Sequence, residues 1–374
     1  MVDSTIFNGL FAQKNLSFEM ALKLPKKLIL EPFLKPHDPM RCRLSRILFI
    51  LCSLLALTSQ SQDGVPVLYD YLTDNIYLLH PAQAGMGFSG KIRLTAGRQW
   101  VSEGDAPNLQ TVSAHARFGE KTGLGVIAFN DENGFSSQKG LQLTYAYHLN
   151  FGRDEIDLNM LSFGLNLGFF EAELDETAFD PRIFDPIIAG TVQSDGFFNV
   201  DVGLSYHFWE FYSYVTVKNL LNRDRQIFTE GLESRNQRSY LLSLGYEFSN
   251  FRRRTYWEPS VLFQFKEETE ESSVDVNLKA YRLMSFGQVW AGVSARRSLD
   301  SADFITNGGG VDNQNLNYFA GLVGINYKDF MFGYTYIKQI GDIQFSNSAF
   351  HQITIGFEFM KRERPYVCHC ASWH

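Results

Sequence analysis

The segment "GLQLTYAYHL", Gly140 to Leu149, alternates strictly between two kinds of side chain. Its large apolar residues fall on one face of an extended strand, and its polar residues and Ala fall on the other face. The same alternation recurs in the segments 157–169, 197–208 and 238–248. Strands of soluble proteins most often have about 5–6 residues, whereas a strand that crosses a bilayer needs about 9–11. The segments therefore predict strands with an apolar face toward lipid and a polar face toward the interior of a barrel.

Fourteen segments of this kind follow residue 87. We expect strands at 88–100, 107–118, 121–130, 138–149, 157–169, 197–208, 211–219, 238–248, 256–266, 273–283, 286–297, 314–327, 330–340 and 348–359. The connections after the even-numbered strands are short. Most connections after the odd-numbered strands are longer, notably 170–196, 220–237 and 298–313. Bacterial outer-membrane barrels have an even number of strands, short periplasmic turns and longer outer loops. The sequence therefore predicts an all-β fold, an antiparallel transmembrane β-barrel in the outer membrane.

Closure of the predicted sheet has a physical reason. A backbone N–H or C=O group that stays unpaired inside a bilayer costs several kcal/mol. An open sheet has two unpaired edges, and closure into a barrel removes both of them.

The beginning of the chain has the organisation of a secretory signal. A basic stretch that ends at Arg46 precedes the apolar run of residues 47–57, and a small residue follows at Ser61. The run is shorter than the roughly 20 residues of a transmembrane helix, so we expect cleavage after Ser61. Met40 directly precedes the basic stretch, which suggests that residues 1–39 are an over-extended start assignment.

The chain is thus expected to have four parts. The presequence and signal peptide occupy residues 1–61, and an N-terminal periplasmic segment follows at 62–86. The barrel itself is expected over residues 87–360, with a periplasmic C-terminal tail at 361–374.

Charge and cysteine content argue against several other classes of protein. The formal net charge is −7, which lacks the basic footprint of a nucleic-acid-binding protein, so no nucleic acid partner is expected. A lipoprotein signal at Cys52 is the weaker alternative, because Leu51 stands where a small residue is required. Beyond the signal only Cys368 and Cys370 remain, and their one-residue spacing is unlike that of zinc sites. We therefore expect no metal, no cofactor and no disulfide framework.

Two polar residues raise the question of catalysis. Ser113 and His115 lie two positions apart on one predicted strand, with Thr111 and Arg117 on the same face, as a barrel hydrolase would require. A nucleophile and its base also need a group that orients the base, and the sequence identifies none. A polar lumen wall consists of such residues in any case. We therefore expect no enzymatic activity.

Glycines recur within the predicted strands, as in "GLGVIAFNDENG", residues 123–134. These pieces lack the strand, GxGxxG and helix setting of a phosphate-binding loop. We interpret the glycines as relief of crowding inside a curved wall.

The segment before the first predicted strand carries a tight elbow. It reads "VLYDYLTDNIYLLHPAQAG", residues 67–85, and "RQWVSEGDAP" follows at 98–107. Together they resemble the start of the PorP/SprF family of type IX secretion system membrane proteins, which has an Asn-Pro-Ala-x-Ala-Gly elbow and an Arg-x-Trp piece. The residues that match are Pro81, Ala82, Ala84, Gly85, Arg98, Gln99, Trp100 and Pro107. His80 stands where the family has Asn.

Two later segments, "DPRIFDP" and "WEPSVLFQF", also look like family segments in the same order, so the resemblance covers most of the mature chain. Pro81 fixes its own φ angle and disfavours helix at His80. We expect residues 65–83 to form a short helical or extended segment at the periplasmic mouth that plugs the barrel in part.

The resemblance implies a function that periodicity alone does not. Members of the family accompany a cognate secreted protein, often a surface adhesin with a C-terminal sorting domain, and assist its export or hold it at the cell surface. Some are connected with gliding motility. The implied partners are the lipid bilayer, the cargo protein and periplasmic type IX secretion components. The expected contact elements are the loops 170–196, 220–237 and 298–313, together with the mouth of the lumen.

The alternative is an outer-membrane channel or transporter for a small or hydrophobic solute, with residues 65–85 as its plug. A third hypothesis, a barrel hydrolase, rests on Ser113 and His115 alone.

Overall fold

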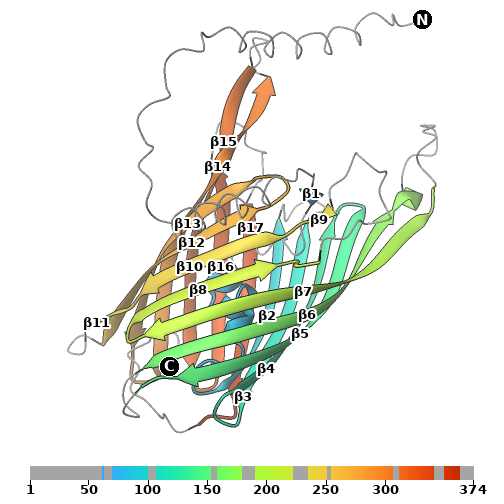
Figure 1. The fold of residues 1–374 in the computed structure, drawn as a ribbon. Coiled ribbons are helices and arrows are strands. Elements are labelled where there is room, and N and C mark those ends of the chain that lie inside the picture. Colours follow the sequence, from blue (N-terminus) through green and yellow to red (C-terminus); the bar gives the residue numbers. More distant parts are fainter. Residues whose placement is uncertain are drawn as a thin grey trace, which may run out of the picture. The chain divides into compact units, whose positions relative to one another are not determined.

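The protein is a closed antiparallel β-barrel of fourteen strands (Figure 1). The structure is a computed structural model that describes residues 61–62, 70–99, 107–152, 158–178, 190–221, 235–250, 254–305, 311–340 and 349–362. In the described part of the chain, no helix combines the length and the apolar character that crossing a membrane requires. The closed antiparallel pairing of the fourteen strands confirms the predicted fold class.

The barrel strands follow the chain around the wall. They are β2 (Gly90–Gln99), β3 (Asn108–Phe118), β4 (Thr122–Asn133), β5 (Ser136–Asn150), β6 (Asn159–Asp175), β7 (Val192–Phe208), β8 (Phe211–Lys218), β10 (Ser239–Tyr246), β12 (Thr255–Lys266), β13 (Ser272–Leu283), β14 (Gly287–Ile305), β15 (Val311–Tyr327), β16 (Phe330–Ile340) and β17 (Ala349–Phe359). Each pairs antiparallel with its neighbours, and β11 (Phe248–Asn250) adds a short pairing to β12. The first and last strands close the barrel, from Gly90 opposite Phe359 to Gln99 opposite Phe350.

Burial in the wall is the reverse of burial in a soluble protein. On β5, Leu143 is 57% exposed, whereas its neighbour Gln142 is 6% exposed. On β16, Phe332 and Tyr334 point outward, and Thr335 is fully buried. The apolar residues of the alternating segments thus cover the outer surface, and the polar residues face the lumen. This arrangement is the one that a lipid environment favours.

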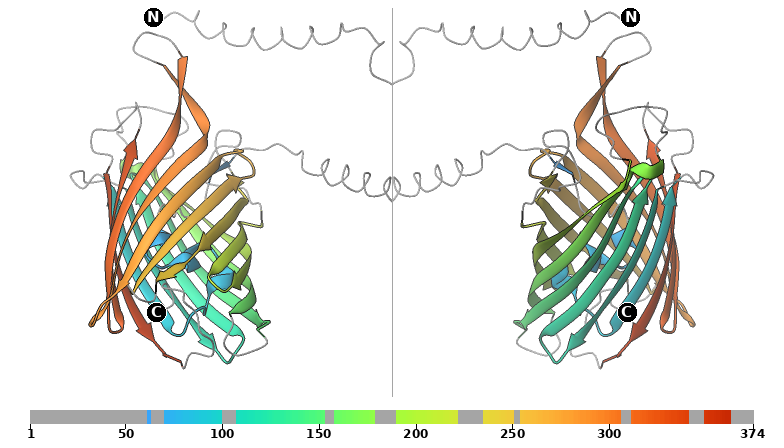
Figure 2. Two further views of the ribbon diagram at one scale, coloured as in Figure 1. Left: turned by 90° about the vertical axis from the view of Figure 1, so that its left-hand side faces the viewer. Right: turned by 90° about the vertical axis from the view of Figure 1, so that its right-hand side faces the viewer.

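The two ends of the barrel differ in their connections. One end, here called the turn end, carries short turns such as Gly119–Lys121 and Trp209–Glu210, and the last barrel strand finishes there. The opposite end, here called the loop end, carries the longer connections and the hairpin tip between β14 and β15 (Figure 2). The last residue of β14 that pairs with β13 is Ser298, so the rest of β14 projects with β15 beyond the rim.

The predicted strand positions agree with the structure except at the loop end. The segments 170–196 and 298–313 were expected to be loops, but β6 continues to Asp175, β7 begins at Val192 and β14 continues to Ile305. These extensions carry many polar residues and lack the lipid-facing alternation from which the boundaries were predicted. A hairpin beyond the rim satisfies its backbone by its own pairing and needs no apolar face.

The N-terminal part of the described chain lies inside the barrel. Residues 70–89, here called the plug, contain three short 3₁₀ helices, η2 (Asp70–Leu72), η3 (Ile76–Leu78) and η4 (Pro81–Gln83). Nearly every plug residue with a described side chain is buried. Figure 2 shows these blue segments surrounded by the strands of the wall. The sequence predicted a segment at the periplasmic mouth that plugs the barrel in part, and the described residues of this segment lie within the lumen.

Candidate functional site: the plug and its docking wall

The elbow of the plug is shaped by proline and glycine. His80 is extended, with φ −122° and ψ 101°, and Pro81 then begins η4 at its first position. Gly85 adopts a φ of 74°, in the left-handed region that favours glycine. A Cβ at Gly85 would also lie 2.8 Å from the Cα of Gly123, so a larger residue has no room there. The elbow predicted from the sequence is therefore a turn pressed against the wall.

The wall offers the elbow a row of small residues. Gly123, Ala146, Gly164 and Gly203 are paired in register across β4, β5, β6 and β7. A Cβ at Gly164 would overlap the backbone N of Ala82, and a Cβ at Gly123 would overlap the carbonyl of Ala84. These four residues, here called the small-residue row, form the seat of the elbow. The sequence interpreted such glycines as relief of crowding inside a curved wall, and at Gly123, Gly164 and Gly203 the crowding atoms include those of the plug.

Wall side chains bind the backbone of the elbow. The Nδ1 atom of His115 accepts a hydrogen bond from the N–H of Gly85 at 3.0 Å, and Arg117 donates to the carbonyl of Gly85 at 3.0 Å. On β5, His148 Nε2 lies 3.0 Å from the carbonyl oxygen of Ala84. Lys218 donates to the carbonyl of Leu78 at 3.0 Å. The carbonyl groups of Leu78, Ala84 and Gly85 and the N–H of Gly85 are thus paired with side chains of the wall, as buried backbone requires.

His80 fixes the elbow to β8 and β10, the two strands that follow the small-residue row around the wall. Its two ring nitrogens lie 2.8 Å from the hydroxyl oxygens of Thr216 on β8 and Ser243 on β10. Burial, reinforced by the charge of Lys218, lowers the pKa of His80 to about 3. The imidazole is therefore neutral at physiological pH, and each hydroxyl can act as the donor or acceptor that the tautomer requires.

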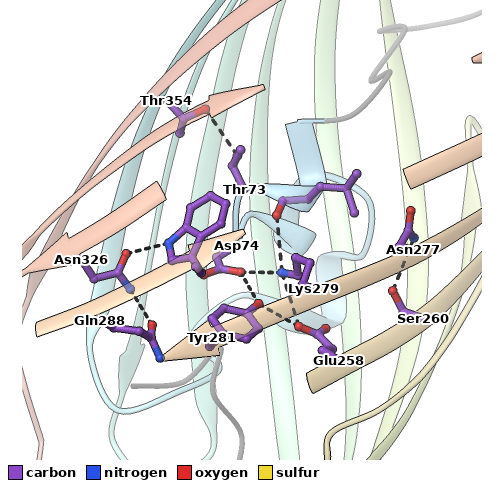
Figure 3. A network of polar contacts seen from close by, with 12 residues as sticks. Thr73, Asp74, Glu258, Ser260, Asn277, Lys279, Tyr281, Gln288, Asn326 and Thr354 are labelled. Carbon is purple, nitrogen blue, oxygen red and sulfur yellow. Dashed lines mark hydrogen bonds and ion pairs between the residues drawn. The ribbon is translucent and has the colours of Figure 1, made fainter. Parts of the chain in front are cut away.

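A buried ion cluster holds the other half of the plug. The carboxylate of Asp74 lies 2.7 Å from the Nζ of Lys279 on β13, and Glu258 on β12 lies 3.4 Å from the same nitrogen (Figure 3). The hydroxyl of Tyr281 lies within 2.9 Å of both carboxylates. All three charged side chains are less than a tenth exposed. We call Asp74, Glu258, Lys279 and Tyr281 the latch.

Further contacts extend the latch toward the start of the plug. The hydroxyl of Tyr71 donates to Asp275 at 2.7 Å, and Asp275 also forms an ion pair with Arg296 at 2.6 Å. Asn75 donates to Ser113 on β3 at 3.0 Å. Each polar side chain of the plug named here therefore meets a partner from the wall.

Apolar contacts fill the space beside the latch. Leu72 and Leu79 of the plug pack in one buried cluster with wall residues that face the lumen, namely Leu241, Tyr256, Leu262, Tyr281, Trp290, Ala320, Leu322, Met331, Ile337 and Phe350. A cavity of about 70 Å³ remains between the plug and the wall, bordered by Gln83, Tyr212 and Lys279 among others. It is large enough for only a few water molecules. At the level of the plug, the lumen is packed.

Ser113 and His115 both face the plug, as their spacing predicted, but they bind different parts of it. Ser113 bonds the side chain of Asn75, whereas His115 bonds the backbone of Gly85. Nδ1 of His115 is occupied by the plug, and no hydrogen bond between the two residues occurs among the described contacts. The arrangement serves docking of the plug and does not have the geometry of a nucleophile and its base.

The residues that carry the family resemblance fall into two groups. Pro81, Ala82, Ala84 and Gly85 form the elbow in the lumen. Arg98 and Gln99 lie at the loop end of β2, where the N–H of Gln99 donates to the carbonyl of Pro107 at 2.9 Å. The structure does not bring the two groups together. Trp100 lies outside the described residues, as does the Cys368 and Cys370 tail.

The latch was not found by sequence analysis. Asp74, Glu258, Lys279 and Tyr281 come from three distant parts of the chain, and no motif or spacing connects them. The sequence gave one weak indication of these residues. Glu258 and Lys279 are charged residues at lumen-facing positions of two predicted strands. Among the described residues, no group of histidine, cysteine, aspartate and glutamate is arranged to hold a metal ion.

Comparison with known proteins gives one family. The family model for "Type IX secretion system membrane protein PorP/SprF" matches residues 60–357. A search of curated protein sequences found no match.

Several solved structures are similar at a low level. The CymD monoaromatic hydrocarbon channel is 10% identical with a TM-score of 0.43, and the alignment covers 77% of this chain and 92% of that one. CdiB from Acinetobacter baumannii is 8% identical with a TM-score of 0.41, and the alignment covers 72% of this chain and 60% of that one. BamA from Haemophilus ducreyi, lacking POTRA domains 1–3, is 9% identical with a TM-score of 0.37, at 73% and 70% coverage.

Proposed function

Because the chain belongs to the PorP/SprF family of type IX secretion system membrane proteins, we propose that it assists export or surface anchoring of a cognate secreted protein. In this proposal the barrel sits in the outer membrane with its loop end outside the cell. The cargo is a surface protein such as an adhesin with a C-terminal sorting domain, and periplasmic components of the secretion system contact the turn end. A role in gliding motility is a further part of the proposal.

The observation that carries this proposal is the family match over residues 60–357, which spans both the plug and the barrel. The packed lumen supports it against the alternative of a solute channel. Among the described residues, the plug packs against the lumen side of the wall and leaves a cavity of about 70 Å³ beside the latch. A barrel that is closed in this way is suited to a binding role at its loop end.

The loop end provides the contact surface in this proposal. The hairpin of β14 and β15 projects beyond the rim, and the connections 170–196 and 220–237 belong to the same end. A variant in which the hairpin is shortened at Ser298 and Asn317, the last positions that pair with β13 and β16, keeps every barrel pairing. This shortened-hairpin variant therefore tests whether the hairpin is needed for cargo binding in a barrel that still assembles.

The test is a strain that lacks this protein. We expect one or a few surface proteins to be lost from the cell surface while uptake of small solutes stays normal, and the wild-type gene to restore them. The shortened-hairpin variant should reach the membrane and fail to restore the cargo. Co-purification in detergent followed by mass spectrometry then identifies the bound protein. Normal surface proteins together with defective solute uptake would support the channel instead.

We also infer that the barrel acts without catalysis. Ser113 and His115 bind the plug, so the Ser113→Ala variant should restore the surface protein as well as the wild type does. A Ser113→Ala variant that reaches the membrane in normal amount but behaves like the deletion strain would revive the hydrolase hypothesis.

A further inference from the structure

Arg98, one of the residues that carry the family resemblance, faces away from the lumen. It lies on the same face of β2 as Leu94, which is 47% exposed, and its own side chain is exposed. Across the closure of the barrel its Cα partner is His351 on β17. His351 shares its face with Ile353, which is 58% exposed. The two basic residues are therefore neighbours on the outer surface of the wall.

A third basic residue belongs to the same surface. His351 is the Cα partner of Tyr336 on β16, and Lys338 lies two residues further along that strand on the same outer face. Diagonal neighbours of this kind are about 7–8 Å apart, which long side chains can bridge. Lys338 is exposed, and it forms no ion pair in the part of the chain that the structure describes. We call Arg98, Lys338 and His351 the basic patch.

Two tyrosines fix the orientation of the imidazole of His351. Its Nδ1 atom lies 2.7 Å from the hydroxyl oxygen of Tyr334, and its ring meets the ring of Tyr336 edge-on, with 5.2 Å between the centroids. When the hydroxyl of Tyr334 donates to Nδ1, the hydrogen of the neutral imidazole is on Nε2. Nε2 has no hydrogen-bond partner among the described residues, so it can donate to a ligand.

The wall around the basic patch offers no counter-charge. Among the described residues of β15, β16, β17 and β2, no aspartate or glutamate occupies an outward-facing position. Lys139 on β5 is different, because its ammonium group lies 4.0 Å from the carboxylate of Glu173 on β6. Charge complementarity therefore points to an anionic ligand at the basic patch.

The basic patch lies near the loop-end edge of the apolar band. Each of its residues is eight positions from the turn-end limit of its strand, which is Gly90 in β2, Phe330 in β16 and Phe359 in β17. Eight residues span about 26 Å along a strand, and a tilt of 35–45° reduces this to a height of about 20 Å. The apolar outer band of such barrels is about 25 Å tall. The patch is thus at the level where hydrocarbon gives way to lipid headgroups.

We propose that the basic patch binds the phosphate group of a lipid in the leaflet at the loop end of the barrel. The guanidinium of Arg98 suits two phosphate oxygens, the ammonium of Lys338 supplies a second charge, and Nε2 of His351 adds a donor. The acyl chains of the same lipid lie on the apolar wall between the patch and the turn end. The ligand is therefore a lipid that carries phosphate, and the proposal depends neither on the cargo nor on which end faces outward.

Lipid binding by the purified barrel in detergent tests this proposal. The protein is titrated with dioleoyl phosphatidic acid, which carries a phosphate monoester, or with dioleoylglycerol, which has the same chains without phosphate. Native mass spectrometry counts the bound lipid. We expect the wild type to retain phosphatidic acid about tenfold more strongly, because charge-assisted hydrogen bonds form only with the phosphate. Equal retention of the two lipids would overturn the proposal.

Variants locate the binding to the patch. The triple variant Arg98→Gln, Lys338→Gln, His351→Gln should lose the preference, whereas the exchange Arg98→Lys, Lys338→Arg should keep most of it. Lys139→Gln is the matched control and should behave like the wild type, since Lys139 already has an acidic partner. Resistance to unfolding in cold detergent confirms that each barrel has formed, and Lys338→Gln alone should weaken retention if the triple variant does not assemble. An equal loss in Lys139→Gln would show unspecific attraction and contradict the patch.

Inorganic phosphate separates a lipid headgroup from a free ion. An excess of inorganic phosphate should leave bound phosphatidic acid in place, because the free ion makes no contact with the apolar wall. Displacement by inorganic phosphate would assign the patch to the free ion and overturn the lipid. These measurements involve neither cargo nor orientation, so their failure is distinguishable from failure of the proposed function.

Discussion

At the scale of single residues, the plug is held by ion pairs and by neutral hydrogen bonds. The loss of an ion pair and the loss of a neutral hydrogen bond should lower the stability of the folded barrel by different amounts. Lys279 compensates two buried carboxylates, Asp74 from the plug and Glu258 from the wall. A buried charge that loses its partner is strongly destabilising, whereas an exposed pair contributes little. His80 instead stabilises the plug as a neutral group between two hydroxyls.

The Lys279→Met variant should therefore lower the stability of the folded barrel by about 3–5 kcal/mol, because Asp74 and Glu258 stay buried without their cation. The measurement is urea unfolding in detergent micelles. Lys139→Met is the matched control, since Lys139 pairs with Glu173 at 4.0 Å on an exposed surface and should cost less than about 1 kcal/mol. Adding Asp74→Asn to Lys279→Met should recover part of the loss. Equal effects of the two lysine variants would contradict a latch.

His80 should make plug docking sensitive to acid. Its pKa is about 3 in the folded state against 6.5 ordinarily, so the folded state disfavours the protonated form. The stabilisation is complete above pH 6.5 and is lost as the pH falls toward 3, at up to about 1.4 kcal/mol per pH unit. The His80→Gln variant should show a flatter stability profile over this range. Parallel profiles of the variant and the wild type would show that other groups cause the acid sensitivity.

At the scale of elements, the fit between η4 and the small-residue row is steric. The row exists only because β4, β5, β6 and β7 are held in a register that brings four small residues side by side. Two of these glycines, Gly123 and Gly164, lie against backbone atoms of the plug, which cannot move aside as a flexible side chain can. A single added methyl group should therefore displace the elbow and leave the strands paired.

We expect Gly164→Ala to release the elbow, since its Cβ would overlap the backbone N of Ala82. Limited proteolysis of the purified barrel should then cut within residues 70–86, where the wild type resists. Gly321→Ala is the matched control, because no neighbouring atom lies within 4 Å of a Cβ at that position. Cleavage of the control at the same rate as Gly164→Ala would mean that the elbow does not depend on the row.

At the scale of the whole molecule, the lumen is closed by the protein's own chain. The wall forms a complete ring of backbone pairing, from β2 to β17, that does not include the plug. The lumen side of the wall combines the polar residues of the alternating segments with the apolar cluster that packs against Leu72 and Leu79 of the plug. Barrel closure and lumen closure are therefore separate properties of this fold.

Deletion of residues 70–86 should leave a folded barrel with an open lumen. In planar lipid bilayers the deletion variant should conduct ions in stable steps, and the wild type should show little conductance. Gly164→Ala should give intermediate, fluctuating conductance, because the latch still holds the first half of the plug. A wild type that conducts as strongly as the deletion variant would contradict the packed lumen.

The sequence by itself determined the wall. Strict alternation over long segments specifies which face of each strand meets lipid, and one-residue register errors would turn every apolar residue inward. That local pattern was sufficient for the fourteen strands, for the closed ring and for the elbow at Pro81 to Gly85. It failed at the loop end, where β6, β7 and β14 extend past the predicted boundaries and lack the alternation of a lipid-facing strand.

Tertiary structure alone decided what fills the barrel. Asp74 and Lys279 are about two hundred residues apart, and their ion pair depends on where the plug stands when the ring has closed. The small-residue row likewise exists only after four strands have settled into register. Alternation is a property of neighbouring residues and can be read along the chain. The contacts of the plug depend on the three-dimensional closure of the wall, which no local pattern records.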